Sequence, residues 1–227
     1  MTVDCRMNLN FATFYFSVIL QSPSKFEERL VTTMDTLIET AHLIIRRFAL
    51  DDLPDIHRIL NAAFSEDAVT LDHREDWLRW TVMNDVQLER LHQPPYGDRA
   101  VVLKASNQLI CSVGLVPAII PAAQLPYFNP TPTPNALHRP EVGLYYGFDP
   151  AYHRQGYGTE AVQGLVDFAF TQLRAERVIA TTDYDNVGSQ AVMRRLGMTI
   201  QRNPFPDPFW CQIVGILENP KQYRVRS

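Results

Sequence analysis

The sequence predicts one α/β (α+β) domain with a mixed central sheet flanked by helices. Its 227 residues are 46% hydrophobic and 20% charged, which suits a globular domain with a single core. Strand and helix patterns follow one another in the order β-α-α-β-β-β-α-β-α-β-β. A hairpin lies in the first half and βα units lie in the second, so we expect antiparallel and parallel neighbours in one sheet.

The first half of this domain contains one strand, two helices and the hairpin. Residues 42–48 (HLIIRRF) are predicted to form a strand, and the acidic residues and early proline at 51–54 open a helix. A second helical pattern covers about residues 73–91. Two β-rich runs, at 100–106 and 109–116, are joined by two residues and predict the hairpin.

A proline-rich segment follows the hairpin. Seven of the sixteen prolines lie between Pro117 and Pro140. Because proline lacks the N–H donor that a sheet requires, we expect an ordered loop or a lid here rather than two more strands. A loop of this length in a compact domain is often functional, and an insertion without a role is the alternative.

The second half alternates strands and helices. We predict a central strand at 142–148, a helix at about 158–173 and a strand at 177–183. A short helix at about 189–196 ends at the glycine that follows it, and a late strand covers residues 210–217. The turn between the central strand and the first of these helices is the most informative part of the chain.

The chain also has two short ends outside the predicted domain, which covers residues 40–218. Residues 1–39 form an N-terminal extension that packs on the domain, joins an oligomer interface or is loosely ordered. Its apolar run at 8–20 is shorter than the ~20 residues that cross a bilayer, and it lacks the charged start and cleavage site of a signal peptide. Residues 219–227 form a C-terminal tail.

Charge and cysteine usage narrow the function classes. The formal net charge of −4 and isoelectric point of about 5.8 argue against general binding to nucleic acid or to an anionic membrane. Cys5, Cys111 and Cys211 are far apart and form no CxxC pattern, so neither a disulfide framework nor a zinc site is indicated. We expect a cytoplasmic protein, monomeric or homodimeric, without a metal.

The informative turn lies in the segment EVGLYYGFDPAYHRQGYGTEA, residues 141–161. It places backbone N–H groups at a helix N-terminus, where unpaired donors and the helix dipole favour a phosphate. Gly156 and Gly158 remove side chains that would keep an anion off the backbone, and His153 and Arg154 add donors. We predict that the segment binds a phosphorylated small molecule; a tight turn without a ligand is the alternative.

The same glycines fit other nucleotide motifs less well. Residues 156–161 match the GxGxxA form of the dinucleotide fingerprint, and Glu176 lies about twenty residues further on. In that fold the first glycine follows the strand almost directly, whereas FDPAYHRQ intervenes here after Gly147. The chain also lacks repeated parallel βα units. No GK[ST] follows the glycines, which excludes a Walker A loop.

The run HRQGYGTEA is preceded by EVGLYYGFDP and followed by DYDNVGSQAVMRRLGM. Together these motifs resemble the GNAT (GCN5-related) N-acetyltransferase family, and most of all its ribosomal-protein N-terminal acetyltransferase branch. Gly156 and Gly158 stand in the glycine positions of the family motif (Q/R)-x-x-G-x-(G/A), and His153 stands in the Gln/Arg position. The resemblance covers about residues 40–217. It implies a GNAT fold, in which the two central strands splay apart.

The resemblance further implies acetyl-CoA as co-substrate and a primary amine, a protein N-terminus or a small amine, as acceptor. The pyrophosphate would lie on the backbone N–H groups of residues 154–159, and the pantetheine arm would pair with residues 146–148 like an added strand. The implied cofactor-binding residues are Tyr146, Gly147, Phe148, His153, Arg154, Gln155, Gly156, Tyr157, Gly158, Thr159, Asn186 and Ser189.

Acetyl transfer needs a proton acceptor for the amine, a donor for the oxyanion and a proton for the departing thiolate. Glu141 matches a Glu common at the head of the central strand in this branch, and we predict it as catalytic. Asp183 and Tyr184, which end the next strand, are predicted with it, and Asp185 is a near-equal candidate. Many family members have a Tyr where this chain has Met193, which leaves the thiolate acid unassigned.

Three functions follow, in descending order. The first is an acetyl-CoA-dependent N-acetyltransferase, and the second is a CoA-binding sensor that has lost the chemistry. An NAD-binding oxidoreductase is a distant third. The acceptor is not encoded in the motifs, although two aromatic loops, at 117–140 and 203–210, suit either an acceptor pocket or simple loop packing.

Overall fold

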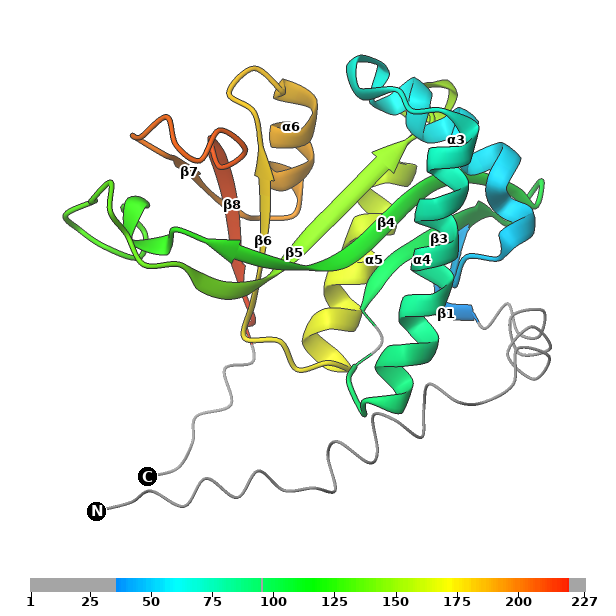
Figure 1. Ribbon diagram of the computed structural model, residues 1–227, viewed down its shortest axis with the longest axis horizontal. Helices are drawn as coiled ribbons and strands as arrows, with labels where there is room; N and C mark the ends of the chain where they lie inside the picture. Colours follow the sequence, from blue (N-terminus) through cyan, green and yellow to red (C-terminus); the bar gives the residue numbers. More distant parts are fainter. Residues whose placement is uncertain (1–35, 95, 221–227) are drawn as a thin grey trace. The chain divides into compact units, whose positions relative to one another are not determined.

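The computed structural model describes residues 36–94 and 96–220, which form a mixed α/β arrangement around an eight-stranded sheet (Figure 1). The strand order is β1-β2-β3-β4-β5-β6-β8-β7. β5 and β6 are parallel, and all other neighbours are antiparallel. The strands are β1 (Thr36–Glu39), β2 (Leu43–Arg46), β3 (Gly97–Leu103), β4 (Gln108–Ile120), β5 (Arg139–Phe148), β6 (Arg177–Thr182), β7 (Thr199–Arg202) and β8 (Ile213–Glu218).

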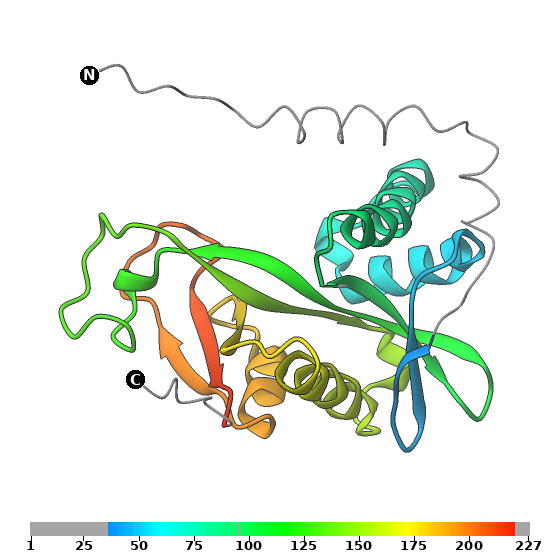
Figure 2. The ribbon, with the colours of Figure 1, turned by 90° about the horizontal axis from the view of Figure 1, so that it is seen from below.

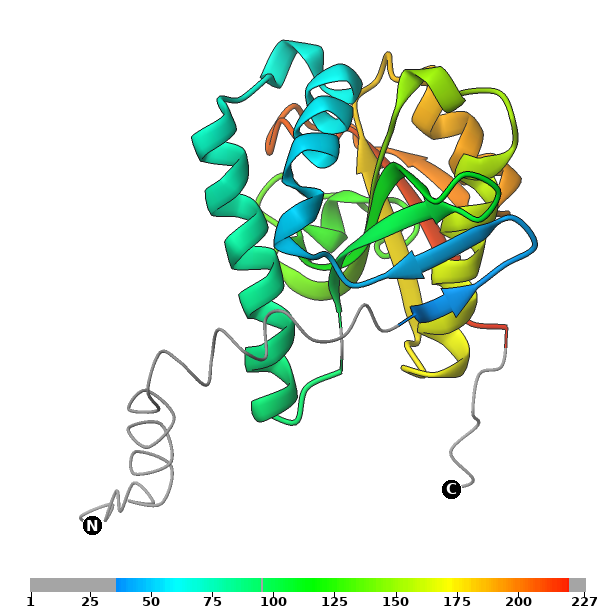
Figure 3. The same ribbon diagram turned by 90° about the vertical axis from the view of Figure 1, so that its right-hand side faces the viewer.

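Helices cover both faces of this sheet (Figures 2 and 3). α3 (Leu53–Ala63) and α4 (Leu71–Arg90) lie on one face, and α5 (Tyr157–Thr171) and α6 (Val187–Arg195) lie on the other. The apolar stripe of α5 packs into the main core, as its spacing predicts. In the part of the chain that the structure describes, no helix is both long and apolar enough to cross a bilayer. The mixed α/β fold class is thus confirmed.

The observed order contains every predicted element and one more strand at its start. β1 pairs with β2 and lies inside the segment predicted as an N-terminal extension. Its four residues are too few to show a strand period in the sequence. The remainder of that extension and the end of the C-terminal tail lie outside the described residues. Of the last two strands in the predicted order, only one has a predicted range, residues 210–217, and it corresponds to β8. The sequence gives no range for β7.

The prolines do not exclude strands, and that expectation was wrong at both ends of the proline-rich segment. β4 continues through Pro117, and β5 has Pro140 as its second residue. At these positions the two strands form a ribbon, because the β3–β4 pairing ends at Leu115 and β5 meets β6 only at Gly143. Each ribbon strand therefore has an open edge, where a missing N–H costs no ladder hydrogen bond.

The loop between these strands, residues 121–138, is docked on the sheet, which confirms the predicted ordered loop. Gln124 and Asn203 are both buried, and a 2.8 Å hydrogen bond between their amides joins two loops. The Tyr127 N–H donates to Gln201 Oε1 of β7 at 3.0 Å. An apolar cluster completes the contact and consists of Ile120, Ala122, Leu125, Ile179, Cys211, Val214 and Ile216.

Candidate functional site

The central strands β5 and β6 separate beyond one point of contact. In the described ranges their only pairing joins Gly143 to Ile179, and from there the strands diverge (Figure 1). Among residues 36–94 and 96–220, the stretch 144–148 of β5 pairs with β4 on one side and with no strand on the other. Its other edge is free to pair with an extended ligand, as an added strand would.

The loop between β5 and α5 presents an unbroken run of free backbone donors. None of the N–H groups of residues 154–159 donates to an acceptor within the described residues. The chain turns here through two left-handed conformations, Arg154 at φ 61° and Gly156 at φ 89°. Successive donors in such a turn converge into an anion-binding nest, and the N-terminus of α5 adds positive partial charge.

The two glycines of this nest have different tasks. Gly156 supplies the positive φ, and a Cβ there would meet no atom of the described residues within 4 Å outside its two chain neighbours. A Cβ on Gly158 would lie 3.3 Å from the Phe148 ring. Glycine at this position therefore lets the first turn of α5 lie against the end of β5. Together they bring the nest beside the free edge of the strand.

The side chains of the nest mostly serve the loop itself. His153 is exposed, and its Nε2 lies 3.3 Å from the Phe148 carbonyl oxygen. The Gln155 amide donates to the Ala151 carbonyl at 3.1 Å. Of residues 153–155, only Arg154 has a side chain without a partner in the described part of the chain. The donors for an anion are thus the backbone groups, with Arg154 available to add charge.

Asn186 and Ser189 form the first turn of α6 and contact β5. Asn186 Oδ1 accepts the Ser189 N–H at 3.0 Å and so caps the helix. The Tyr146 hydroxyl donates to the Ser189 carbonyl at 3.3 Å, and burial raises the pKa of this hydroxyl. The structure therefore brings three of the predicted cofactor residues together on the diverging side of Gly143.

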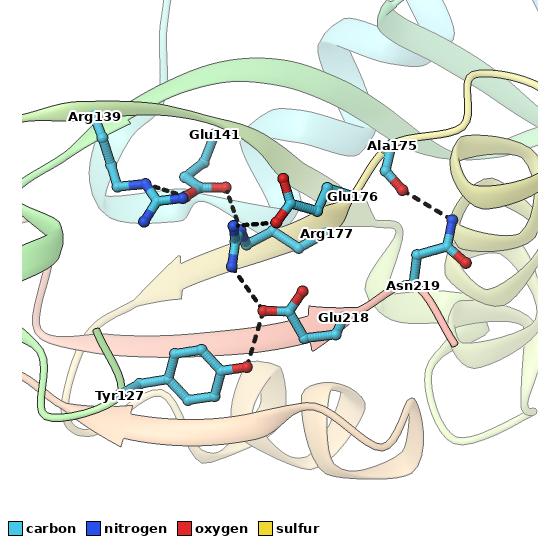
Figure 4. A network of polar contacts seen from close by, with 8 residues as sticks. All are labelled: Tyr127, Arg139, Glu141, Ala175, Glu176, Arg177, Glu218 and Asn219. Carbon is cyan, nitrogen blue, oxygen red and sulfur yellow. Dashed lines mark hydrogen bonds and ion pairs between the residues drawn. The ribbon is translucent and has the colours of Figure 1, made fainter. Parts of the chain in front are cut away.

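Glu141 lies in a polar network at the start of β5 and β6 (Figure 4). Its carboxylate is 5% exposed and pairs with Arg139 Nε at 2.8 Å and with Arg177 Nε at 3.0 Å. Arg177 also binds Glu218 at 2.7 Å and Glu176 at 2.9 Å. The network links β5, β6 and β8 near the point where β5 and β6 pair, before the two strands diverge.

This location separates Glu141 from the nest. Glu141 precedes Gly143, whereas the free edge of β5 follows it. At about 3.3 Å per residue, the α-carbons of Glu141 and Phe148 lie roughly 23 Å apart along the strand. Burial raises the pKa of the Glu141 carboxyl, and the charges of Arg177 and Arg139 act against that rise. The geometry gives Glu141 an ion-pairing role, and its assignment as a base stays a prediction.

Asp183 and Tyr184 follow β6, and their side chains differ in how many contacts they make. The Asp183 side chain is exposed and has no partner among the described residues. Tyr184 is held on three sides. Its hydroxyl donates to the Asn203 carbonyl at 2.8 Å, its N–H donates to Gln212 Oε1 at 2.8 Å, and the Arg202 guanidinium lies 3.9 Å from its ring centre. Of the two, Asp183 has the side chain available for proton transfer.

Met193 belongs to the core rather than to the site. It is 1% exposed, and its Sδ lies 3.0 Å from the place that a Cβ on Gly215 would take. The Met193 side chain therefore offers no proton donor to the space between the diverging strands β5 and β6.

Two residues that the sequence reasoning missed shape the nest. Asp149 caps the short η4 turn (Pro150–Tyr152) by accepting the Ala151 N–H at 3.0 Å. It also accepts Arg58 Nη1 of α3 at 2.5 Å. An Asp directly before a Pro is a local capping signal that identifies Asp149. No local signal identifies Arg58, which is 91 residues away in the chain.

A nest of backbone N–H groups beside a free strand edge is an arrangement that could hold an extended, phosphorylated ligand. The family model for the acetyltransferase (GNAT) domain matches residues 42–199, which is more than half of the chain. The chain belongs to the GNAT acetyltransferase family.

Individual relatives agree with this family at lower coverage. A stretch of 61 residues is 36% identical to the uncharacterized N-acetyltransferase YnaD of Bacillus subtilis (strain 168), covering 27% of this chain and 35% of that protein. The chain thus matches about a third of the length of this relative.

Solved structures share the fold. The ribosomal-protein-S5-alanine acetyltransferase from Vibrio fischeri superposes with a TM-score of 0.58 at 16% identity, over 82% of this chain and 98% of that one. RimL, a ribosomal L7/L12 alpha-N-protein acetyltransferase in complex with coenzyme A, gives 0.53 at 15% identity, over 80% and 96%. At these identities the likeness shows the fold alone.

Proposed function

We propose that this protein is an acetyl-CoA-dependent N-acetyltransferase that acts on a primary amine. The observation that carries the proposal is the meeting of the nest at residues 154–159 with the free edge of β5. CoA combines a pyrophosphate, which suits the nest, with an extended amide-containing arm, which suits a strand edge. The complex of RimL with coenzyme A, on the same fold, supports the assignment.

The residues present fit this ligand. The N–H groups of residues 154–159 would hold the pyrophosphate, and Gly156 has no side chain to keep an anion off them. The backbone of residues 146–148 would pair with the arm, with Asn186 and Ser189 beside it. Acetyl-CoA supplies the activated thioester when it is bound. The free N–H groups of the β5 edge supply donors for an oxyanion.

The acceptor amine has to lose a proton before it attacks. Asp183 is the strongest of the three predicted catalytic residues, because its carboxylate is exposed and unpaired among the described residues. We assign it acceptor binding and proton transfer. Glu141 and Tyr184 are engaged in ion pairs and hydrogen bonds. We propose that Glu141 joins the starts of β5 and β6, and that Tyr184 supports the loop beside Asp183.

The acceptor that we propose is a protein N-terminus, as in the ribosomal-protein acetyltransferase branch of the family. The likeness of fold to the Vibrio fischeri enzyme and to RimL supports a protein N-terminus, and a small amine is the other choice. The burial of Met193 favours one alternative function, a CoA-binding sensor, because it leaves the thiolate without a tyrosine at that position.

Calorimetry and a turnover assay test these functions in sequence. We expect acetyl-CoA to bind and at least one member of a panel of N-terminal peptides and small amines to release free thiol. Binding of CoA with no turnover across the panel would identify the sensor. Tight binding of NAD without binding of CoA would overturn both.

The nest itself is tested by Gly156→Ala. The methyl group strains the left-handed conformation by about 1 kcal/mol and adds a side chain to the middle of the run of free donors. We expect acetyl-CoA affinity to fall by about tenfold, which is ~1.4 kcal/mol. Calorimetry measures the affinity, and urea unfolding measures the stability.

Gly197 supplies the matched control. It has φ 77° and equally open space around a Cβ, but it follows the C-terminus of α6. Gly197→Ala is expected to lose similar stability and to keep its affinity for acetyl-CoA. An equal loss of affinity in both variants would contradict the nest.

A further inference from the structure

Asp149 is the residue at which the chain leaves β5 for the nest. Its N–H donates to the Ile110 carbonyl of β4 at 3.0 Å, which holds it to the sheet. Its side chain accepts the Ala151 N–H at 3.0 Å, and its carbonyl accepts the Tyr152 N–H at 2.9 Å. The residue is 4% exposed. The direction in which the chain departs from the sheet is therefore set around this one carboxylate.

Arg58 of α3 is the guanidinium that holds this carboxylate. Its Nη1 donates to Asp149 Oδ2 at 2.5 Å, and its Nη2 lies 3.7 Å from Asp55 of the same helix. Burial alone would raise the pKa of Asp149. The hydrogen bonds from Arg58 and from the Ala151 N–H outweigh burial, and the pKa lies below its ordinary value. Asp149 is consequently charged at neutral pH and paired with a helix from the opposite face of the sheet to α5.

α3 and the residue that follows it also pack against the end of β5. A Cβ on Gly147 would lie 2.8 Å from Leu60 of α3 and 2.8 Å from Phe64, which directly follows that helix. The Phe64 ring also stacks on Tyr145, with 6.1 Å between ring centres. α3 thus contacts the part of β5 that carries the free edge, and through Arg58 it contacts the loop that carries the nest.

We propose that Arg58 and Asp149 are a positioning pair that sets the phosphate nest at its working distance from the free edge of β5. The inference rests on the proposed function, because it assigns the two features to adjoining segments of one CoA molecule, the pyrophosphate and the pantetheine arm. Neither residue belongs to the nest or to the free edge of β5. The pair acts by fixing the exit of the chain from β5 against α3, so its loss should matter only for donors that use the nest.

A comparison of two donors tests the pair. S-acetyl-pantetheine carries the thioester arm without the pyrophosphate, so its use does not depend on the nest. With acetyl-CoA, we expect Arg58→Met to raise KM by about tenfold and to change kcat by less than about threefold. With S-acetyl-pantetheine we expect no change in kcat/KM. Arg58→Lys keeps the charge and is expected to recover part of the loss.

Asp55→Asn is the matched control, because it removes the other carboxylate near Arg58 and leaves Asp149 in place. We expect this variant to have the KM and kcat of the wild type with both acetyl-CoA and S-acetyl-pantetheine. Asp149→Asn gives a second variant of the pair itself, with the same expected loss for acetyl-CoA alone. If the protein binds without turnover, dissociation constants for acetyl-CoA and pantetheine give the same comparison.

The outcomes separate the pair from the proposed function. A wild-type protein that neither binds nor uses acetyl-CoA would overturn the function. If the wild type is active and both Arg58→Met and Asp149→Asn keep its KM for acetyl-CoA, the positioning role of the pair is overturned. Equal losses with both donors would also overturn it, since they would indicate general damage to the fold, which thermal unfolding would register.

Discussion

Glu141→Gln is expected to lower the free energy of unfolding by about 3 kcal/mol while leaving kcat of the folded protein within about threefold. The Glu141 carboxylate is 5% exposed and lies between two guanidinium groups (Figure 4). Without its charge, Arg177 stays buried beside Arg139 with less compensation. Breaking a buried pair from one side costs roughly 3–5 kcal/mol, and the low end applies here because Arg177 keeps Glu218.

Glu176→Gln is the control for this prediction. Glu176 pairs with the same arginine at 2.9 Å, but its side chain is 75% exposed. Its loss should cost less than about 1 kcal/mol. Urea unfolding measures both variants, and thiol release measures kcat. Wild-type stability of Glu141→Gln together with a loss of activity beyond about a hundredfold would instead identify Glu141 as the base.

Asp98→Asn is expected to raise the free energy of unfolding at pH 8 by up to roughly 3 kcal/mol. Asp98 is 8% exposed and lies over Gly114 of β4, and its Oδ1 has no hydrogen-bond partner within the described part of the chain. Burial raises the pKa of this carboxyl from 3.8 to about 6, with the charge of Arg99 acting against the rise and that of Asp85 adding to it. A neutral amide avoids the cost of burying this charge.

The sign of the pH dependence follows from that pKa. Folded protein keeps the Asp98 proton up to about pH 6, whereas the unfolded chain loses it near pH 3.8. The contribution of Asp98 to stability is therefore greatest below pH 3.8 and is lost as the pH rises through about 6. Urea unfolding from pH 4.5 to pH 8 should show this decline in the wild type and lack it in Asp98→Asn. Parallel curves for the two proteins would contradict the prediction. Asp55→Asn, on an exposed surface, should follow the wild type.

The nest was predictable because its determinants are local. Gly156, Gly158 and the preceding strand lie within one strand–turn–helix unit, and the free N–H groups belong to consecutive residues. The proline-rich segment shows the limit of such reasoning. Composition alone predicts that Pro117 and Pro140 break strands, but the cost of a missing N–H depends on whether a neighbouring strand is present at that edge.

By itself the sequence determined the mixed α/β domain, the order of its elements and the glycine turn before α5, since each depends on residues close together in the chain. Only the tertiary structure decided which polar side chains are engaged. It buried Glu141 between Arg139 and Arg177, joined Arg58 to Asp149, and left the Asp183 side chain without a partner among the described residues. The physical reason is that the partner and the burial of a side chain are set by strand register and by packing between distant segments. Local periodicity carries no information about either.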